Sequence, residues 1–454
     1  MFQSYDDISE KDQSAGRIAA LRAWLADNGL DGFILHRGDE FQGEYVAAYA
    51  GRLSWLTGFT GSAGVVIVLK DKAAIFVDGR YTIQVKEQTD DSVLTALDVT
   101  SEPPAKWLAK NVSAGEKIAF DPWLLTTAQV EKYQKQAQSA NARLVAVDHN
   151  PVDAIWTDQP ARPSGKIFTQ PIELAGRAAH EKIAGIQKQL NDKKAKAVVL
   201  TLSDSVSWLF NIRGSEIAHN PVVLAFAIVP ESGKAQLFLD AAKVPDEVHK
   251  QLERTTTIEP PENFAPALAR LAGSGAAIMV DPDHAASAII TLIEENGGAI
   301  IRASDPCILP KACKNEAELN GARAAHRRDG AVMARFLSWL AETAPDGGLD
   351  EVAVAKKLEA LRAETGKLRD ISFDTISAAG PHAAIPHYRV TTSTSLPLEM
   401  NRIYLVDSGA QYEDGTTDIT RTVITGTPTA QMKDRFTRVL KGMINLTLAR
   451  FPEG

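Results

Sequence analysis

A nine-residue signature occurs twice in this chain and constrains its architecture more than any other feature. The stretches SWLTGFTGS (54–62) and SWLFNIRGS (207–215) share Ser, Trp, Leu, Gly and Ser at identical offsets. Each copy follows a helix pattern and a strand pattern, and each precedes an expected strand hairpin. This matched order favours an internal duplication of about 150 residues, with Trp55 and Trp208 at equivalent core positions.

The segments around the two copies alternate between helical and extended patterns. Helices are expected at residues 15–30 and 181–195, strands at 31–36 and 197–201, and hairpins at 63–81 and 222–240. Alternation of this kind is typical of layered structures that mix helices with a sheet. Both copies are therefore predicted to be domains of the α/β (α+β) class.

The length of 454 residues suggests about three domains. The segment 150–166 contains three prolines and little periodicity, which indicates an ordered linker, and a second boundary is expected at 305–315. The predicted domains are therefore 1–158, 159–310 and 311–454. In the third, a capping box of Asn315 and Glu318 opens a helix, a second helix is expected at 350–366, and residues 372–390 and 404–423 have strand patterns.

Charge and hydropathy argue against several classes of partner. The net charge is −8, so no overall basic field would attract nucleic acid or an anionic membrane. The N-terminal stretch MFQSYDDISEKDQ lacks the pattern of a signal peptide, and apolar runs such as 222–229 are too short to span a bilayer. Cys307 and Cys313 are expected to be reduced thiols. We therefore expect a cytoplasmic protein.

Two aspartates flank a polar loop in YLVDSGAQYEDGTTDITRTV (404–423). Asp407 ends an apolar strand, and Asp418 begins the next one after an Asp-Gly turn signal. If the two residues lie opposite each other on paired strands, their carboxylates repel each other and favour divalent cations such as Mn²⁺ or Mg²⁺ between them. The alternative interpretation is a routine turn flanked by solvated acids.

His387, in GPHAAIPHYR, is the second candidate for chemistry, and it is expected just before a strand. A neutral histidine can ligate a metal or move a proton near pH 7, although a loop histidine held by hydrogen bonds is the commoner case. His382 is expected to be exposed.

At these residues the chain resembles a known family. The stretches SFDTISAAGPHAAIPHYRV (372–390) and 404–423 are similar to aminopeptidase P, the Xaa-Pro aminopeptidase, in its long three-domain form. Four further stretches resemble the same form in the same order: SWLTGFTGSAG, DGRY, VDAIWTDQPARP and WLFNIRGSEIAHNPV. The resemblance therefore spans essentially the whole chain. It implies two creatinase-N-like domains followed by a catalytic domain of the "pita-bread" group, which also contains prolidase and methionine aminopeptidase.

The resemblance implies a role for each candidate residue. Asp407 would ligate one metal ion, Asp418 would bridge two, and His387 would contact substrate and assist proton movement. The expected cofactor is two Mn²⁺ ions per site, and the expected substrates are peptides with proline at the second position. The long members are commonly homodimers.

The sequence also departs from the family pattern. The full site has two Asp, one His and two Glu, and the last three should follow Asp418. Here no histidine follows His387, and the only glutamate after Asp418 is Glu453. We therefore expect a truncated catalytic domain, from a fragment or a truncation, with a natural short form that has lost catalysis as the alternative. Residues 429–451 predict an amphipathic helix that should cover a sheet.

Other functions were weighed against the leading hypothesis of an Xaa-Pro metallo-aminopeptidase. A prolidase or another pita-bread hydrolase fits the aspartates, but the duplicated N-terminal domains and the length disfavour it. A metal-free hydrolase or a catalytically inactive binding module should lack the acidic pair, which this chain keeps.

Overall fold

The computed structural model describes residues 2–452. The chain divides into two compact units, one formed by residues 8–321 and the other by residues 2–7 together with 322–452. The boundary between the units falls inside the long helix α14 (Glu316–Thr343). The first residues of the chain therefore pack with its last third.

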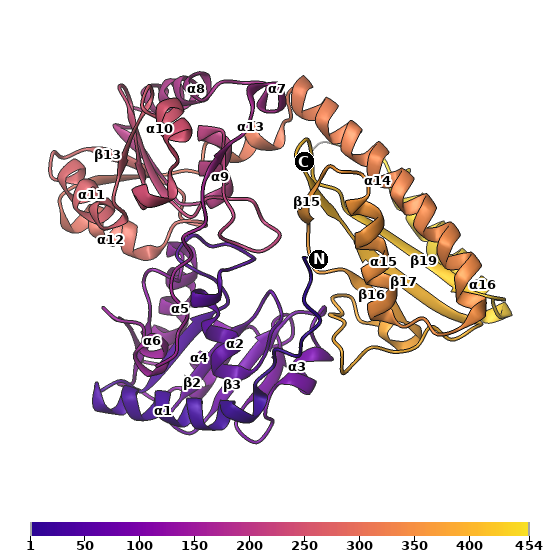
Figure 1. Ribbon diagram of the computed structural model, residues 1–454. Coiled ribbons are helices and arrows are strands. Elements are labelled where there is room, and N and C mark those ends of the chain that lie inside the picture. Colours follow the sequence, from indigo (N-terminus) through magenta and orange to yellow (C-terminus); the bar gives the residue numbers. More distant parts are fainter. Residues whose placement is uncertain (1, 453–454) are drawn as a thin grey trace. The chain divides into compact units, whose positions relative to one another are not determined.

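The first half of the larger unit is built on a six-stranded mixed sheet with the order β4-β3-β2-β1-β5-β6 (Figure 1). Its strands are β1 (Gly32–His36), β2 (Val65–Leu69), β3 (Ala73–Val77), β4 (Thr95–Asp98), β5 (Lys117–Phe120) and β6 (Arg143–Ala146). Its helices are α1 (Ser14–Asp27), α2 (Arg52–Thr57), α3 (Gln84–Gln88), α4 (Pro104–Asn111), α5 (Thr127–Ser139) and α6 (Pro151–Ile155). The turn at Lys70–Lys72 joins β2 and β3, which pair antiparallel as expected for the predicted hairpin at 63–81.

The second half repeats this arrangement, with the strand order β12-β11-β10-β8-β13-β14. Its strands are β8 (Ala197–Leu200), β10 (Phe226–Pro230), β11 (Ala235–Phe238), β12 (Thr256–Glu259), β13 (Ala277–Val280) and β14 (Ala299–Arg302), and a small pair is formed by β7 (Phe168–Thr169) and β9 (Ile212–Arg213). Its helices are α7 (Ile172–Ala175), α8 (Ala179–Asp192), α9 (Ser203–Phe210), α10 (Asp246–Leu252), α11 (Phe264–Ala272), α12 (Ser287–Glu295) and α13 (Ile308–Ala312). Corresponding strands of the two sheets also pair in the same directions. The predicted duplication is confirmed.

The pleat of the central strand β8 explains how the second sheet is covered on both faces. Side chains alternate along a strand, so Val198 and Leu200 pack into the core formed with α8 and α9. Ala197 and Val199 point the other way, into the core formed with α11 and α12. This two-sided burial accounts for the continuously apolar sequence of the strand.

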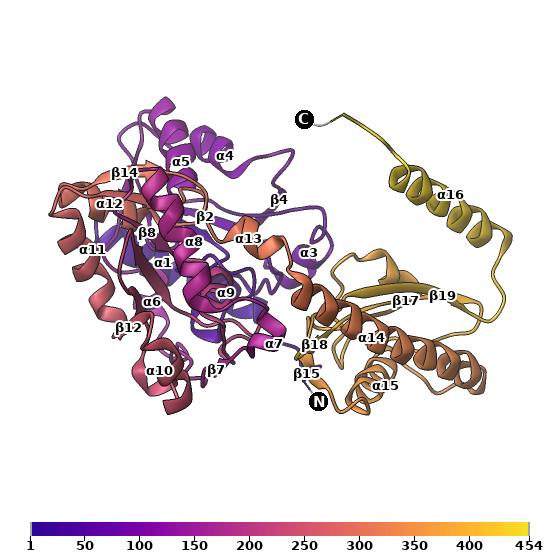
Figure 2. The same cartoon turned by 90° about the horizontal axis from the view of Figure 1, so that it is seen from above.

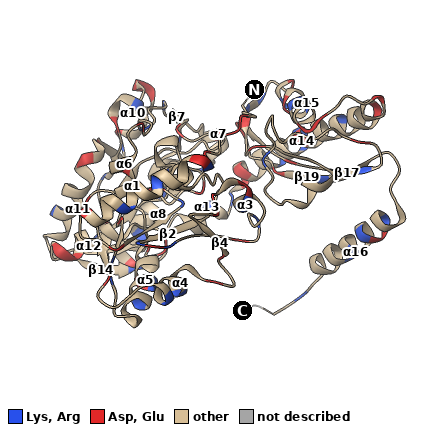
Figure 3. Ribbon diagram, turned by 90° about the horizontal axis from the view of Figure 1, so that it is seen from below, with Lys and Arg blue, Asp and Glu red and all other residues tan. Residues whose placement is uncertain are grey.

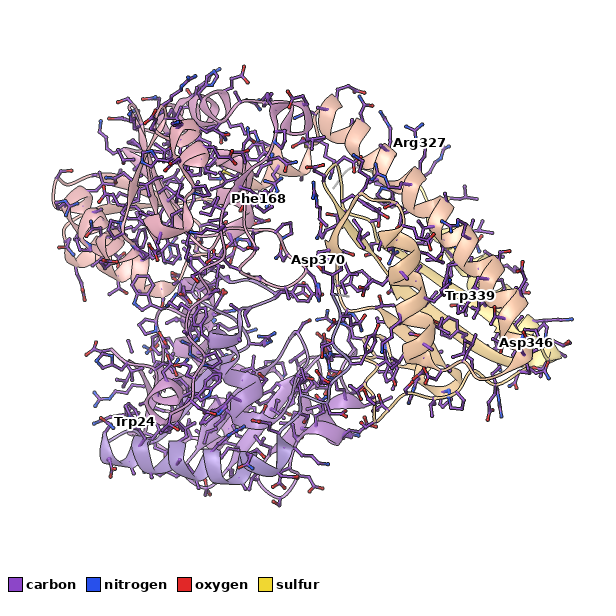
Figure 4. All side chains as sticks on the ribbon, viewed as in Figure 1. Trp24, Phe168, Arg327, Trp339, Asp346 and Asp370 are labelled. Atoms are coloured by element: carbon purple, nitrogen blue, oxygen red, sulfur yellow. The ribbon has the colours of Figure 1, made fainter. Side chains whose placement is uncertain are left out.

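The smaller unit packs helices against one face of a three-stranded sheet. The helices α14 and α15 (Glu351–Ala363) cover the sheet β16-β17-β19, formed by β16 (Ile376–Ala379), β17 (Arg402–Ser408) and β19 (Ile419–Thr425), and β15 (Leu368–Ile371) pairs with β18 (Ala410–Tyr412). The predicted capping box at the start of α14 is present, because Asn315 and Glu318 exchange hydrogen bonds of 2.9 and 3.1 Å. Arg327 is exposed on the outer side of α14, whereas Trp339 is half-buried (Figure 4).

Two expectations for the last third are wrong. Within residues 372–390 only β16 is a strand, because Gly380–Ala384 forms a short 3-10 helix and irregular backbone follows it. Helix α16 (Ala430–Thr447) forms, but it lies apart from β17 and β19 (Figure 2), and none of its residues is buried within the described part of the chain. Basic and acidic residues both mark the ribbon of α16 (Figure 3).

Candidate metal and active site

Asp407 lies on β17, on the face of the sheet that points away from the helices. Tyr404 and Val406 are buried against α14 and α15. Residues at odd and even positions of a strand point to opposite faces, so Leu405 and Asp407 share the other face, where both are half-buried. The sequence pattern therefore places one carboxylate on the face opposite the one that Tyr404 and Val406 pack against α14 and α15.

The register of the hairpin differs from the expectation that the two aspartates face each other directly. Asp407 pairs with Thr420, and Asp418 lies two positions earlier along the second strand. The difference arises because Tyr412 and Gly415 close the turn with a 2.9 Å backbone bond, so that Glu413 and Asp414 form its tip. A diagonal neighbour two positions away remains on the same face and within reach.

The environment of Asp407 suits a bound cation. Its Oδ1 atom is buried and has no hydrogen-bond partner among the described residues. Burial raises the pKa of Asp407, the Thr420 side chain lowers it, the charge of Asp418 raises it, and His387 lowers it, with a net result above the ordinary value. A carboxylate that is desolvated and repelled by a second carboxylate gains most from a positive ion.

His387 is brought near Asp407, although the strand expected directly after it does not form. It is half-buried in the irregular segment after the short 3-10 helix, and its imidazole is close enough to Asp407 to affect the pKa of that carboxyl. His382, expected to be exposed, is instead half-buried with its Nδ1 atom 2.9 Å from the carboxylate of Glu351.

A buried ion pair holds the ends of the strands that carry the two aspartates. The guanidinium of Arg362 donates to both carboxylate oxygens of Asp329 at 2.8 and 3.0 Å, and it also donates to the Gly409 carbonyl at 3.2 Å. Asp329 in turn accepts from the hydroxyls of Tyr412 and Thr417 at 2.9 and 3.0 Å. Burial raises the pKa of Asp329, but the Arg362 charge and these hydrogen bonds outweigh it and hold the pKa below its ordinary value.

The described residues supply only part of a metal site. Residues 2–452 contain no group of three or more His, Cys, Asp or Glu placed to hold a metal ion. Glu453, the one glutamate after Asp418, lies outside the described residues. The sequence singled out the two aspartates and His387 as candidates, which the structure brings near one another, but did not point to Thr420, Glu351 or Asp329. Only Thr420 carried a local signal, because it alternates with Asp418 along the strand.

Comparisons with known families cover nearly the whole chain. A model of the creatinase/prolidase N-terminal domain matches residues 17–155, and a second model with the same description matches residues 158–318. The metallopeptidase family M24 matches residues 320–454. Two creatinase-type domains before an M24 domain define the class as an M24 metallopeptidase with a duplicated N-terminal region.

Individual relatives narrow this class. A probable Xaa-Pro aminopeptidase P of Coccidioides posadasii is 38% identical over 450 residues, which cover 96% of this chain and 69% of the relative. The corresponding protein of Talaromyces stipitatus is 38% identical over 458 residues, covering 96% and 68%. The crystal structure of the cytosolic X-prolyl aminopeptidase of Caenorhabditis elegans, which has a di-nuclear active site, matches with a TM-score of 0.90 and 32% identity over 97% of this chain and 75% of that one.

The chain belongs to the Xaa-Pro aminopeptidase P family. The resemblance noted from its motifs and the predicted fold class are confirmed. The match over 96% of the chain also disfavours the prolidase interpretation, because it includes both N-terminal domains.

Proposed function

We propose that the protein is a metal-dependent aminopeptidase that releases the N-terminal residue from peptides with proline second. The observation that carries this proposal is the buried, unpartnered Oδ1 atom of Asp407 beside Asp418, within an M24 domain of this family. Such an atom has a high desolvation cost, which a divalent cation would offset. Asp407 and Asp418 would each contribute carboxylate oxygen to the metal centre.

Two divalent ions, when bound, supply Lewis-acid activation of water and of the scissile carbonyl. We propose Mn²⁺, because carboxylate oxygens suit it. The residues of this chain then have separate tasks. Asp407 and Asp418 hold positive charge at the face of the sheet, and His387 contacts the substrate and carries a proton beside Asp407.

The preference for proline follows from the peptide bond itself. The amide before proline has no N–H, so a peptidase that grips this hydrogen cannot use such a substrate. An enzyme that relies on a pocket for the proline ring and on charge at the carbonyl has no such requirement. This distinguishes an Xaa-Pro aminopeptidase from a general one.

The test combines metal content with cleavage by the full-length protein. We expect metal analysis to find bound divalent ion and an Xaa-Pro peptide to lose its first residue, while the matched Xaa-Ala peptide is cut much more slowly. Asp418→Asn should lose both properties. Asp434→Asn, which changes an exposed carboxylate on α16, should keep both.

Two results would contradict this assignment. A full-length protein that bound no divalent ion and left Xaa-Pro bonds intact would not be an aminopeptidase of this kind. Retained metal and activity in Asp418→Asn would remove this residue from the site.

Three further properties are part of the proposal. We propose that the protein is cytoplasmic and forms a homodimer, because both properties are expected from family membership. Cell fractionation tests the location, and analytical ultracentrifugation tests the oligomeric state. Among the described residues no helix is long and apolar enough to cross a bilayer. We also propose that the domains span residues 1–158, 159–310 and 311–454. Limited proteolysis, which should cut first near these boundaries, tests this division.

A further inference from the structure

Glu351 is a fully buried carboxylate at the first position of α15, and four donors converge on it. The backbone N–H groups of Ala379 and Leu396 donate at 2.6 and 3.0 Å. The hydroxyl of Tyr388 donates at 2.9 Å, and Nδ1 of His382 lies 2.9 Å from Oε1. Charge-assisted bonds of this kind are roughly twice as strong as neutral ones.

These donors bracket His387 on both sides. Tyr388 follows it directly and is buried, and the ring of His382 packs on that of Tyr388 with their centroids 4.2 Å apart. The Ile385 N–H donates to the His382 carbonyl at 3.0 Å, and the Tyr388 N–H donates to the Ile385 carbonyl at 3.2 Å. The irregular backbone that carries His387 is thus closed into successive turns whose side chains end on Glu351.

The charge of Glu351 is what makes this arrangement specific. Both of its oxygens accept, Oε1 from Ala379 and Oε2 from Tyr388 and Leu396, whereas a glutamine has only one accepting oxygen. An amide group at this position would place an N–H against a donor and leave at least one buried donor without a partner. No neutral side chain of the same size can therefore hold the segment in the same way.

We propose that Glu351 is a positioning residue that fixes the segment 379–396 and thereby holds the imidazole of His387 beside Asp407. The role of His387 in catalysis rests on the proposed function above, but its placement by Glu351 does not. Glu351 makes no contact with substrate in this proposal. It acts through Tyr388 and the turns around His387.

Structural readouts test the proposal without any turnover. We compare Glu351→Gln with Glu359→Gln, a buried glutamate on the same helix that accepts from the Phe2 N–H at 2.8 Å. Ring carbon-proton NMR spectra of the histidine-labelled protein should show a shifted or broadened His387 signal in Glu351→Gln only, with the signal assigned by its loss in His387→Gln. Hydrogen exchange of residues 380–396 should also accelerate in this variant only.

Kinetics provide a second readout once Xaa-Pro cleavage is established. A misplaced imidazole should lower kcat about 10- to 100-fold, because His387 no longer carries the proton, and should raise KM to a smaller extent, because His387 also contacts the substrate. Tyr388→Phe removes one hydroxyl and no charge, so it tests the same idea if Glu351→Gln does not fold. It should shift the His387 signal and lower kcat less.

The proposal and the assigned activity fail in different ways. Unchanged His387 signals and unchanged exchange of residues 380–396 in Glu351→Gln, or in Tyr388→Phe where the first variant is unfolded, would overturn the positioning role. Absence of Xaa-Pro cleavage with a shifted His387 signal would instead leave Glu351 as the positioning residue and reject the activity.

Discussion

Asp39 carries an unusual carboxyl in the loop after β1. It is fully buried, and its Oδ1 atom accepts from the N–H groups of Phe41 and Gly43 at 3.0 and 3.1 Å. Its Oδ2 atom has no hydrogen-bond partner among the described residues. Burial and the adjacent charge of Glu40 raise the pKa of Asp39 to about 6.

We expect Asp39→Asn to stabilise the protein at neutral pH. An Asp with a raised pKa binds more protons when folded, so its contribution to stability falls as pH rises from about 4 to about 6. The asparagine keeps an oxygen for both accepted bonds and carries no charge. Its advantage in unfolding free energy should be near zero below pH 4 and reach up to about 3 kcal/mol above pH 6.

Urea unfolding at a series of pH values measures this difference. Burial lowers the pKa of His36 to about 4, so the contribution of His36 to stability decreases as pH falls. Both proteins contain His36, and its effect therefore cancels in the difference between them. A difference that does not change with pH would show that Asp39 is not desolvated as the structure indicates.

At the scale of single residues, the sequence singled out candidate residues that stand in local patterns, but not the contacts that hold the backbone around them. Asp407, Asp418 and His387 stand in local patterns, and the structure brings them together. The hydrogen bonds from Ala379 and Tyr388 to Glu351 cross 28 and 37 positions. No local periodicity encodes such distant contacts, so the sequence placed Glu351 only near the start of the helix expected at 350–366.

At the scale of elements, the N-terminal segment 2–7 behaves as a strap on the smaller unit. The side chain of Gln3 accepts from the Thr375 N–H at 2.8 Å and donates to the Thr375 carbonyl at 3.3 Å. The carbonyl of Tyr5 accepts from the Thr392 N–H at 2.7 Å. The strap therefore supports the backbone on both sides of the segment that carries His387.

We expect Gln3→Ala to lower the stability of this unit by about 1–3 kcal/mol. Gln3 and Thr375 are both buried, so the substitution leaves a backbone N–H and a carbonyl without partners. Thermal unfolding and hydrogen exchange around β16 measure the effect. Ser4→Ala is the matched control in the same strap, because Ser4 is exposed and should change stability by less than about 0.5 kcal/mol. Equal effects of the two substitutions would mean that the strap is not anchored through Gln3.

Elements with strong periodicity were predicted well, and those without it were not. The hairpins β2–β3 and β10–β11 form at the predicted residues, because their turns and apolar runs lie close in sequence. The run 372–390 resembles a strand, yet Glu351 and the strap hold most of it as irregular backbone. Tertiary contacts of this kind override local propensity.

At the scale of the whole molecule, the duplication extends to how the two domains meet. The Ala128 N–H donates to the Pro282 carbonyl at 3.0 Å, and the Ala288 N–H donates to the Pro122 carbonyl at 3.0 Å. The two accepting prolines occupy equivalent positions in the DP motifs at 121–122 and 281–282 of the two copies. Thr126 and Ala286 form an isolated antiparallel β-bridge in the same region. Each copy therefore uses the equivalent loop to contact the other, and the two contacts are related by an approximate two-fold symmetry. The signature motifs predicted two copies but carried no information on this joint.

The duplication also repeats one contact around the paired tryptophans. Arg17 on α1 donates to the Trp55 carbonyl at 2.6 Å and lies 4.5 Å from the centroid of its ring. Lys182 on α8 donates to the Trp208 carbonyl at 2.8 Å and lies 4.2 Å from that ring. Both copies thus place a cation over the tryptophan and bond it to the same backbone atom, although the residue differs.

We therefore expect Arg17→Lys to be tolerated and Arg17→Ala to be costly. Lys182 shows that an ammonium group can make both contacts in this framework, so the first change should cost less than about 1 kcal/mol. The alanine leaves a carbonyl of the domain without its charged donor and removes the cation from the ring, which should cost about 1–3 kcal/mol. Urea unfolding of the three proteins measures both. If the lysine variant were as unstable as the alanine variant, the copies would share a sheet but not this contact, since the guanidinium would then be needed for a reason that Lys182 does not share.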